Sequence, residues 1–130
     1  MRRRTFGMWR QWIVLAVCLA VSGWAQAQSQ GDWVLARWQN GEYWFPGVVA
    51  SRTADSVTVA YDDGTRETLP LSRVRPYDWK PGTPVQCRWK DGSQWYAGRI
   101  SAINDDGVTL YVAYDDGDRE KTRTALCRSL

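Results

Sequence analysis

The side chains best suited to chemistry in this 130-residue chain are aromatic rings that stand beside carboxylates. Tyr61 is followed by Asp62-Asp63-Gly64, and Tyr114 is followed by Asp115-Asp116-Gly117. The face of an aromatic ring is electrostatically negative, so several rings around one point stabilise a poorly hydrated cation, and a carboxylate at the rim adds to the attraction. These residue types therefore favour cation binding.

Catalysis has little support in the composition. The chain contains no His and three Cys, and no Gly-rich phosphate loop follows a predicted strand. No nucleophile with an adjacent base and no pair of carboxylates in an evident cleft can be picked out. We therefore expect a protein that is not an enzyme and that uses no cofactor; an enzymatic function would need an unexpected cleft between two parts of the chain.

Three acidic pairs, Asp62-Asp63, Asp105-Asp106 and Asp115-Asp116, could suggest calcium binding. They lack the alternating Asp spacing and the later bidentate Glu of an EF-hand loop. An Asp in a turn commonly accepts a hydrogen bond from its own backbone two residues on. We therefore expect turns here, and we predict no metal site.

After its N-terminal segment, the chain consists of two copies of one sequence repeat. Ala60–Glu67 returns as Ala113–Glu120 with an offset of 53, and Val34–Gly41 is matched by Val85–Gly92 with an offset of 51. The second copy thus carries two extra residues, which we place around residues 110–112. Self-similarity at a fixed period indicates a repeated structural unit.

Residues 1–27 are typical of a secretory signal peptide. Four arginines stand among residues 2–10, an apolar stretch of 13 residues runs from Trp12 to Trp24, and Ala25-Gln26-Ala27 has the form of a signal-peptidase site. The stretch is shorter than the 18 or so residues of a membrane span. We predict a cleaved leader, a secreted periplasmic protein and no stable membrane span; the alternative is an inner-membrane anchor through an uncleaved leader.

Net charge argues against a nucleic-acid partner. The chain has 17 basic and 14 acidic residues, and four basic but no acidic ones lie in residues 1–27, which leaves 13 basic against 14 acidic residues, a net charge of −1. Binding to phosphates needs a basic stripe, and every basic run of the remaining chain is interleaved with carboxylates. We therefore expect no nucleic-acid binding.

Alternating apolar residues after the leader predict strands, and no segment there has helical periodicity. In the first copy we expect strands over 33–38, 43–51, 56–61 and 66–69, and a one-turn helix or short strand over 71–75. In the second copy the corresponding ranges are 85–89, 94–103, 108–114, 119–122 and 125–128. Two units of about 50 residues are near the lower limit for a separate core, so we expect heavy use of aromatic residues, packing of the two copies against each other, or a covalent crosslink.

Glycines and prolines divide these strands. We expect tight turns at Asn40-Gly41 and Asp91-Gly92, because both residues of each pair tolerate a positive φ. Gly47 and Gly98 should mark a bulge or a close backbone approach. The junction over residues 76–82 contains two prolines and should be semi-rigid, with its two aromatic residues wedged between the units.

The chain resembles a known family. Val-x-Ala-Arg-Trp over residues 34–38, an Asn-Gly or Asp-Gly turn, an aromatic pair and then Tyr-Asp-Asp-Gly-x-Arg-Glu are similar to the Tudor and agenet members of the SH3-like barrel group. The resemblance covers nearly all of residues 32–130, twice. It implies an all-β protein of two tandem small SH3-like (Tudor-like) barrels after an N-terminal signal peptide, with the barrels at residues 28–79 and 80–130.

In that family, a cage of aromatic side chains near the open end of the barrel holds a methylated Lys or Arg. By position, the resemblance implies a cage in the first copy made of Trp38, Phe45, Tyr61 and Asp63. The cage of the second copy would be Trp89, Tyr96, Tyr114 and Asp116. The alternative is that these rings only fill the core of a small barrel. Trp44 and Trp95 should face the other way on their strands and pack in the core or between the units.

The resemblance also bears on two cysteines. Cys87 aligns with Ala36, and Cys127 aligns with Val74, on strands that neighbour each other in an SH3-like barrel. In an oxidising compartment this implies a disulfide that closes a loop of about 40 residues and stabilises the fold by roughly 3–4 kcal/mol. The alternative is two free buried thiols.

The expected function is a non-catalytic extracytoplasmic binding module that recognises a peptide, a protein or a small cationic group of the methylammonium type through its aromatic cages. The alternative is a structural or assembly protein of the cell envelope with no ligand pocket. A solvent-open pocket lined by Trp38, Phe45 and Tyr61 would favour the first interpretation. Rings buried against the other barrel would favour the second.

Overall fold

The computed structural model describes residues 28–130. The signal-peptide prediction concerns residues 1–27, which lie outside this range. Within residues 28–130, no helix is long and apolar enough to cross a membrane.

The first unit is a five-stranded antiparallel sheet in the order β4-β3-β2-β1-β5. Its strands are β1 (Trp33–Arg37), β2 (Trp44–Arg52), β3 (Ser56–Tyr61), β4 (Arg66–Pro70) and β5 (Val74–Pro76). Two 3₁₀ turns, η1 (Trp38–Asn40) and η2 (Leu71–Arg73), follow β1 and β4. The segment expected to be a helix or a strand is thus a one-turn helix followed by a strand.

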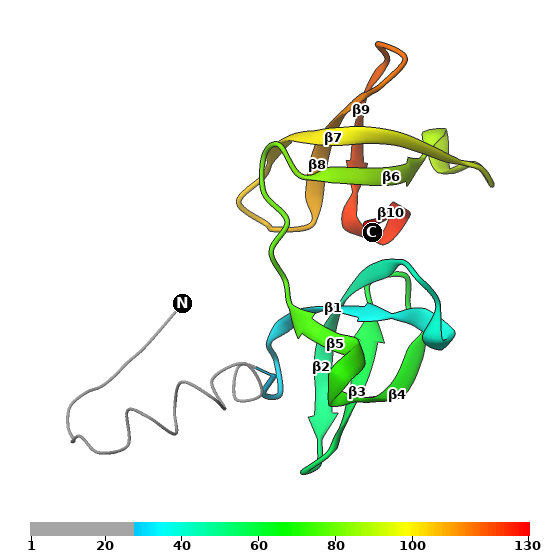
Figure 1. Cartoon of the computed structure of the whole chain (residues 1–130). Helices are drawn as coiled ribbons and strands as arrows, with labels where there is room; N and C mark the ends of the chain where they lie inside the picture. The colour runs from blue at the N-terminus through cyan, green and yellow to red at the C-terminus, as the bar shows by residue number, and fades with distance from the viewer. Residues whose placement is uncertain (1–27) are drawn as a thin grey trace.

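The second unit repeats this architecture in the order β10-β6-β7-β8-β9. Its strands are β6 (Pro84–Arg88), β7 (Trp95–Ile103), β8 (Thr109–Tyr114), β9 (Arg119–Arg123) and β10 (Cys127–Arg128), with 3₁₀ turns η3 (Trp89–Asp91) and η4 (Thr124–Leu126). Figure 1 shows the two units joined by one short connection. The all-β fold of two small SH3-like barrels is confirmed; the proposed boundary between residues 79 and 80 falls in this connection and stays a prediction.

The two extra residues of the second copy lie in a loop. β2 and β7 are offset by 51 residues and β3 and β8 by 53, so the insertion falls in residues 104–108, opposite residues 53–55 of the first copy. The prediction that it lies around residues 110–112 was wrong. β8 pairs with β7 and β9 along its length, and an insertion there would turn its side chains to the wrong face, whereas a loop absorbs extra residues easily.

The tight turns after β1 and β6 differ from the expected geometry by one residue. Gln39 (φ 51°) and Asn40 (φ 61°) take the left-handed conformation, whereas Gly41 is extended at φ −80°. The Gly41 N–H donates to the carbonyl of Trp38 at 2.9 Å, and a Cβ on Gly41 would lie 3.1 Å from that oxygen. The glycine is therefore needed for this close approach, not for a positive φ. The second copy repeats the arrangement with Lys90, Asp91 and Gly92.

Gly47 and Gly98 mark close backbone approaches, as expected. A Cβ on Gly47 would lie 2.7 Å from the carbonyl oxygen of Ala60, and one on Gly98 would lie 2.6 Å from that of Ala113. The bulge is separate and lies two residues further along, between Val49 and Ser51 of β2 and at the equivalent place in β7. Each long strand can therefore bend tightly across its neighbour.

Two clusters of buried apolar side chains form the core. One fills the first barrel and contains Val34, Ala36, Val49, Val57, Val59, Tyr61, Leu69 and Val74. The other fills the second barrel and continues into the first through Leu35, Trp44 and Trp79. β1 is therefore buried on both faces, because alternate residues of the strand belong to different clusters.

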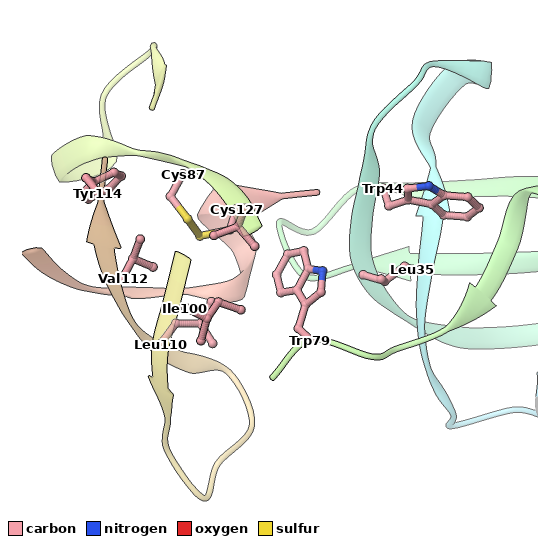
Figure 2. Packing of buried hydrophobic residues seen from close by; sticks show 10 residues of the cluster. Leu35, Trp44, Trp79, Cys87, Ile100, Leu110, Val112, Tyr114 and Cys127 are labelled. Atoms are coloured by element: carbon pink, nitrogen blue, oxygen red, sulfur yellow. A yellow bond between two sulfur atoms is a disulfide. The ribbon is translucent and has the colours of Figure 1, made fainter. Parts of the chain in front are cut away.

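The junction between the barrels is packed and hydrogen-bonded. Trp79 is 5% exposed, and its indole N–H donates to the hydroxyl of Ser129 at 3.1 Å. Trp44 and Ser129 exchange two backbone hydrogen bonds, of 2.7 and 3.0 Å. Figure 2 shows Trp79 between the disulfide-linked side and the side that carries Trp44 and Leu35. The C-terminal segment of the second barrel thus docks on β2 of the first.

Candidate functional site

Three successive elements of the first barrel bring three rings together. Trp38 stands at the start of η1, Phe45 near the start of β2, and Tyr61 at the end of β3. The rings of Trp38 and Tyr61 meet edge to face with centroids 5.5 Å apart, and those of Phe45 and Tyr61 lie 6.5 Å apart at 90°. The pairing of Gly47 with Tyr61 sets the position of Tyr61 opposite the start of β2.

These rings line a cavity of about 230 Å³. Trp38 and Phe45 are half-buried, whereas Tyr61 is only 5% exposed. The full lining is Trp38, Phe45, Pro46, Tyr61, Asp63, Thr65 and Ala125. All four residues expected in the first cage therefore border one cavity, and their role in binding stays a prediction.

Glu67 ties two parts of this cavity together. Its Oε1 accepts a hydrogen bond from the Tyr61 hydroxyl at 2.8 Å, and its Oε2 accepts one from the backbone N–H of Gln39 at 2.9 Å. Gln39 directly follows Trp38, so one carboxylate orients the buried phenol and fixes the turn that carries the indole.

The phenol of Tyr61 stays protonated well into the alkaline range. Burial raises its pKa most, and the hydrogen bond to Glu67 and the negative charge of that carboxylate raise it further. Burial together with Glu120 raises the pKa of Tyr114 in the same way. Both tyrosines are therefore neutral rings and hydrogen-bond donors at any physiological pH.

The second barrel forms a matching cavity of about 210 Å³. Trp89 and Tyr114 meet edge to face at 5.7 Å, and the Tyr114 hydroxyl donates to Glu120 Oε1 at 2.6 Å. Glu120 Oε2 accepts from the backbone N–H of Lys90 at 2.7 Å, as Glu67 does in the first barrel. The lining residues are Trp89, Tyr96, Tyr114, Asp116 and Asp118. The four residues expected in the second cage thus also lie together.

The two cavities differ at their rims. Asp118 of the second stands where the first has Thr65, so the second cavity carries two carboxylates and the first carries one. Ala125 of η4 belongs to the wall of the first cavity, although it is part of the second barrel. Tyr96 is 44% exposed, which makes the second cavity the more open on that side.

The acidic turns show the expected turn chemistry. Asp63 Oδ1 accepts hydrogen bonds from the backbone N–H and the hydroxyl of Thr65, at 3.0 and 2.7 Å. Asp106 binds the hydroxyl and backbone N–H of Thr109, and these bonds lower the pKa of its carboxyl. These carboxylates are therefore occupied, at least in part, by their own turns.

Trp44 and Trp95 face away from the cavities, as expected. The guanidinium carbon atoms of Arg37 and Arg75 lie 4.8 and 4.3 Å from the centre of the Trp44 ring. The Trp95 ring lies 4.0 Å from the guanidinium of Arg128. Phe45 also touches Trp95, at 6.1 Å, so one cage ring is supported by the other barrel.

Cys87 and Cys127 form a disulfide between β6 and β10. Both residues are completely buried and directly opposite each other in the strand pairing. Ala36 and Val74 face each other at the same place in the first barrel. The expected pairing is confirmed, and the alternative of two free thiols is not observed.

Sequence reasoning did not find every residue around the cavities. It missed Pro46, Thr65, Glu67, Ala125, Asp118 and Glu120. A signal for the two glutamates was available, because both copies place a Glu six residues after the buried Tyr. No local pattern could indicate Ala125, whose position depends on how the barrels dock.

Comparisons with known proteins agree with this fold. Residues 31–79 match the family model of the Agenet domain. Tudor domain-containing protein 1 of Mus musculus is 43% identical over 47 residues, which are 35% of this chain and only 4% of that protein's length. The first barrel is therefore Agenet-like in sequence, and the chain has a Tudor/agenet-like fold.

Two solved structures are also similar. One is AGDP1 AGD34 of Arabidopsis thaliana, at 18% identity and a TM-score of 0.42, with 91% of each chain covered. The other is the ADCP1 tandem Agenet domain 3-4, at 18% identity and a TM-score of 0.40, with 91% of this chain and 89% of that chain covered.

Proposed function

We propose that this chain is a non-catalytic binding module that recognises a peptide or a small methylammonium-type cation through aromatic cages. The observation that carries the proposal is the convergence, in each barrel, of three rings from three successive elements on one cavity. In both barrels, the innermost ring belongs to a Tyr whose hydroxyl is held by a Glu. The Agenet match of residues 31–79 supports a reader of this kind.

The chemistry of the cavities fits a cation of low hydration. A methylated ammonium gives up little hydration, and ring faces attract it by about 0.5–2 kcal/mol per contact. Asp63 and Asp116 at the rims add negative charge. Cavities of about 230 and 210 Å³ are smaller than those that enclose a drug-sized molecule, so each admits a single head group or side chain.

We place this function outside the cytoplasm. The signal-peptide features of residues 1–27 support secretion to the periplasm, with an inner-membrane anchor as the alternative. The disulfide between Cys87 and Cys127 supports an oxidising compartment, where such bonds persist. The ligands to be expected there are choline-like or betaine-like groups and cationic peptides.

A structural role in the cell envelope is the second candidate. Its support is the apolar cluster that continues from one barrel into the other, because barrels used as packing units would share such a cluster. The solvent-accessible cavities weigh against it as the whole function, because a pure packing unit gains nothing from leaving two ring-lined hollows unfilled.

An NMR titration of residues 28–130 tests the proposal. We expect tetramethylammonium, choline, betaine, trimethyl-lysine or dimethyl-arginine to shift the indole signals of Trp38 or Trp89. The neutral isostere 3,3-dimethylbutanol should bind about tenfold more weakly than choline, a difference of about 1.4 kcal/mol, because it lacks the charge. Equal binding of the two, or no saturable shift at millimolar ligand, would contradict the proposal.

Each barrel serves as the control for the other. Trp38→Ala should abolish the shifts of the backbone amide signals of Phe45 and Tyr61 and leave those of the second cavity. Trp89→Ala should do the reverse, with the amide signals of Tyr96 and Tyr114 as reporters. Dispersed signals from the unchanged barrel verify that the protein is folded. A ligand that shifts both sites equally in both variants binds elsewhere.

A further inference from the structure

The outer face of β9 carries an unbroken row of positive charge. Arg119, Lys121 and Arg123 alternate along the strand, and all three are exposed. The residues between them, Glu120 and Thr122, point to the interior face. Interleaving with Glu120 in the sequence therefore does not neutralise this face.

The row belongs to a larger surface that crosses three strands. On β8, Tyr111 stands opposite Lys121, and on β7, Arg99 shares a row of the sheet with Arg119. A hollow of about 500 Å³ opens here, and its border includes Tyr111, Arg119, Glu120 and Lys121. Tyr111 is 36% exposed at this surface. We call Arg99, Tyr111, Arg119, Lys121 and Arg123 the basic face.

Carboxylates offset the basic face only in part. Glu120 is held on the opposite side by Tyr114 and Lys90. Among residues 28–130, the one ion pair within 4.0 Å joins Arg88 and Asp91, and neither belongs to the basic face. Hydrogen bonds within its own turn, and then the positive charge of Lys121, lower the pKa of the Asp106 carboxyl, so this carboxylate offsets the charge of Lys121 in part.

The first barrel lacks this face, although its fold is the same. Thr68 occupies the place of Lys121, and Thr58 occupies the place of Tyr111. The two threonines stand opposite each other, and their hydroxyls are hydrogen-bonded at 2.8 Å. Pro70 occupies the place of Arg123, and Val48 that of Arg99. The charge is therefore a property of the second copy and is not required by the fold.

The free edge of β9 is also open to a further strand. β9 is the last strand of its sheet. The N–H of Tyr114 bonds to the carbonyl of Asp118, and the N–H of Thr124 bonds to that of Val108, so the even-numbered residues face β8. In an antiparallel sheet, the backbone N–H and C=O groups of successive residues point to opposite sides of the strand. Those of Arg119, Lys121 and Arg123 therefore point away from β8, toward the free edge.

The corresponding edge in the first barrel is blocked at one position. Pro70 is the counterpart of Arg123, and a proline has no N–H with which to bind an added strand. Arg123 has that N–H. The two barrels therefore differ both in the charge of this edge and in its backbone donors.

We propose that β9 and the basic face bind an extended acidic peptide by strand addition. Alternate side chains of a strand lie about 6.6–6.8 Å apart on one face, so Asp or Glu at every second position of the added strand would oppose Arg119, Lys121 and Arg123. Backbone hydrogen bonds supply affinity and the charge pattern supplies specificity. This site is independent of the aromatic cages and takes a ligand of the opposite charge.

Fluorescence anisotropy tests the proposal on the purified chain with a short labelled peptide that has Glu at every second position and Thr or Val between. We expect saturable binding that weakens with added salt, and loss of affinity when Gln replaces the peptide's Glu. Lys121→Glu should weaken binding about tenfold or more, because it places like charges opposite each other. Arg66→Glu on the first barrel should leave the affinity unchanged.

Two variants at one position separate charge from strand addition. Arg123→Gln removes the charge, and Arg123→Pro removes both the charge and the backbone N–H. The first barrel already has a proline, Pro70, at the equivalent position, so the fold tolerates proline there. We expect the Pro variant to bind distinctly more weakly than the Gln variant. Circular dichroism and the cage tryptophan signals verify the fold of both.

Three results would overturn the proposal. The first is an absence of binding, or equal binding by the wild type and Lys121→Glu. Either result would mean that the positive charges only prevent the free edge of β9 from pairing with other chains. The second is equal binding by the Gln and Pro variants at position 123, which would exclude strand addition. The third is tighter binding of single-stranded oligothymidine than of the acidic peptide, with the same sensitivity to Lys121→Glu, which would assign the face to nucleic acid.

Discussion

The ring of Trp33 lies directly against Gly107, so that a Cβ on residue 107 would overlap the far edge of the indole. Gly107 also has a positive φ of 76°. The contact joins the start of β1 to the loop before β8 and covers one side of the junction between the barrels. Gly107→Ala must therefore both strain the backbone and displace the indole.

We expect Gly107→Ala to lower the free energy of unfolding by about 2–5 kcal/mol, from backbone strain of about 1–2 kcal/mol and overpacking of about 1–3 kcal/mol. Denaturant unfolding measures the change. Gly117→Ala is the matched control, because Gly117 has a φ of 99° with open space around its Cβ position. Equal losses for the two variants would mean that the indole moves aside freely.

Removal of the disulfide should destabilise the second barrel. The bond closes a loop with a sequence separation of 40, for which the loss of constraint on the unfolded chain is about 3–4 kcal/mol. We expect Cys87→Ala with Cys127→Val, the residues of the first barrel at these places, to lower the free energy of unfolding by about this amount. Reduction of the wild type should reproduce the effect, and an unchanged unfolding midpoint after complete reduction would contradict it.

Alkaline pH should destabilise the fold through its buried tyrosines. The unfolded phenols ionise near pH 10, whereas burial raises the folded pKa of Tyr77 to about 12 and that of Tyr61 further still. The folded state then holds more protons than the unfolded state, so the free energy of unfolding is unaffected below pH 9 and falls as pH rises from 10 towards 12.

Tyr61→Phe isolates one of these phenols. We expect its free energy of unfolding to fall less steeply between pH 10 and 12, by up to about 1.4 kcal/mol per pH unit, with curves parallel to those of the wild type below pH 9. Urea unfolding at a series of pH values gives both slopes. Identical slopes in the alkaline range would show that the Tyr61 phenol ionises normally in the folded protein.

Glu67→Gln tests how the first cage is held. The variant can still accept from Tyr61, but its amide offers a donor where the Gln39 N–H needs an acceptor, so we expect a loss of about 1–2 kcal/mol. The Trp38 indole signal should shift or broaden, because its turn is no longer anchored. Glu42→Gln, an exposed carboxylate outside both cavities, should change neither quantity.

Local patterns were sufficient for the strands, whereas the cavities and the disulfide followed from the family resemblance. Period-two alternation predicted the strands, and the internal repeat put equivalent residues of the two copies in register. The resemblance to the Tudor and agenet members pointed to Trp38, Phe45 and Tyr61. It also implied the disulfide, because Cys87 and Cys127 align with residues on strands that neighbour each other in an SH3-like barrel, and the structure shows them directly opposite each other.

Features that depend on long-range docking or on fine backbone geometry were not predictable. Ala125 reaches the first cavity only because η4 is carried there by the other barrel. The left-handed conformation of Gln39 could not be inferred beside an Asn-Gly pair, which is the stronger local signal. The sequence did not predict the basic face, because Glu120 stands between Arg119 and Lys121 in the chain, although its side chain points to the other side of the strand.

The bridge between Trp44 and Ser129, together with the buried Trp79, fixes the spacing of the two cages. Independent domains on a flexible linker would engage almost any ligand with two cationic groups, with an effective concentration set by linker length. Here the connection is short and the barrels share an apolar cluster. On the proposed function, one polymer would occupy both cages only if the distance between its cationic groups matched the distance between the cages. The tandem arrangement would then select a ligand by the spacing of its charged groups and turn two weak contacts into avidity for one repeat length.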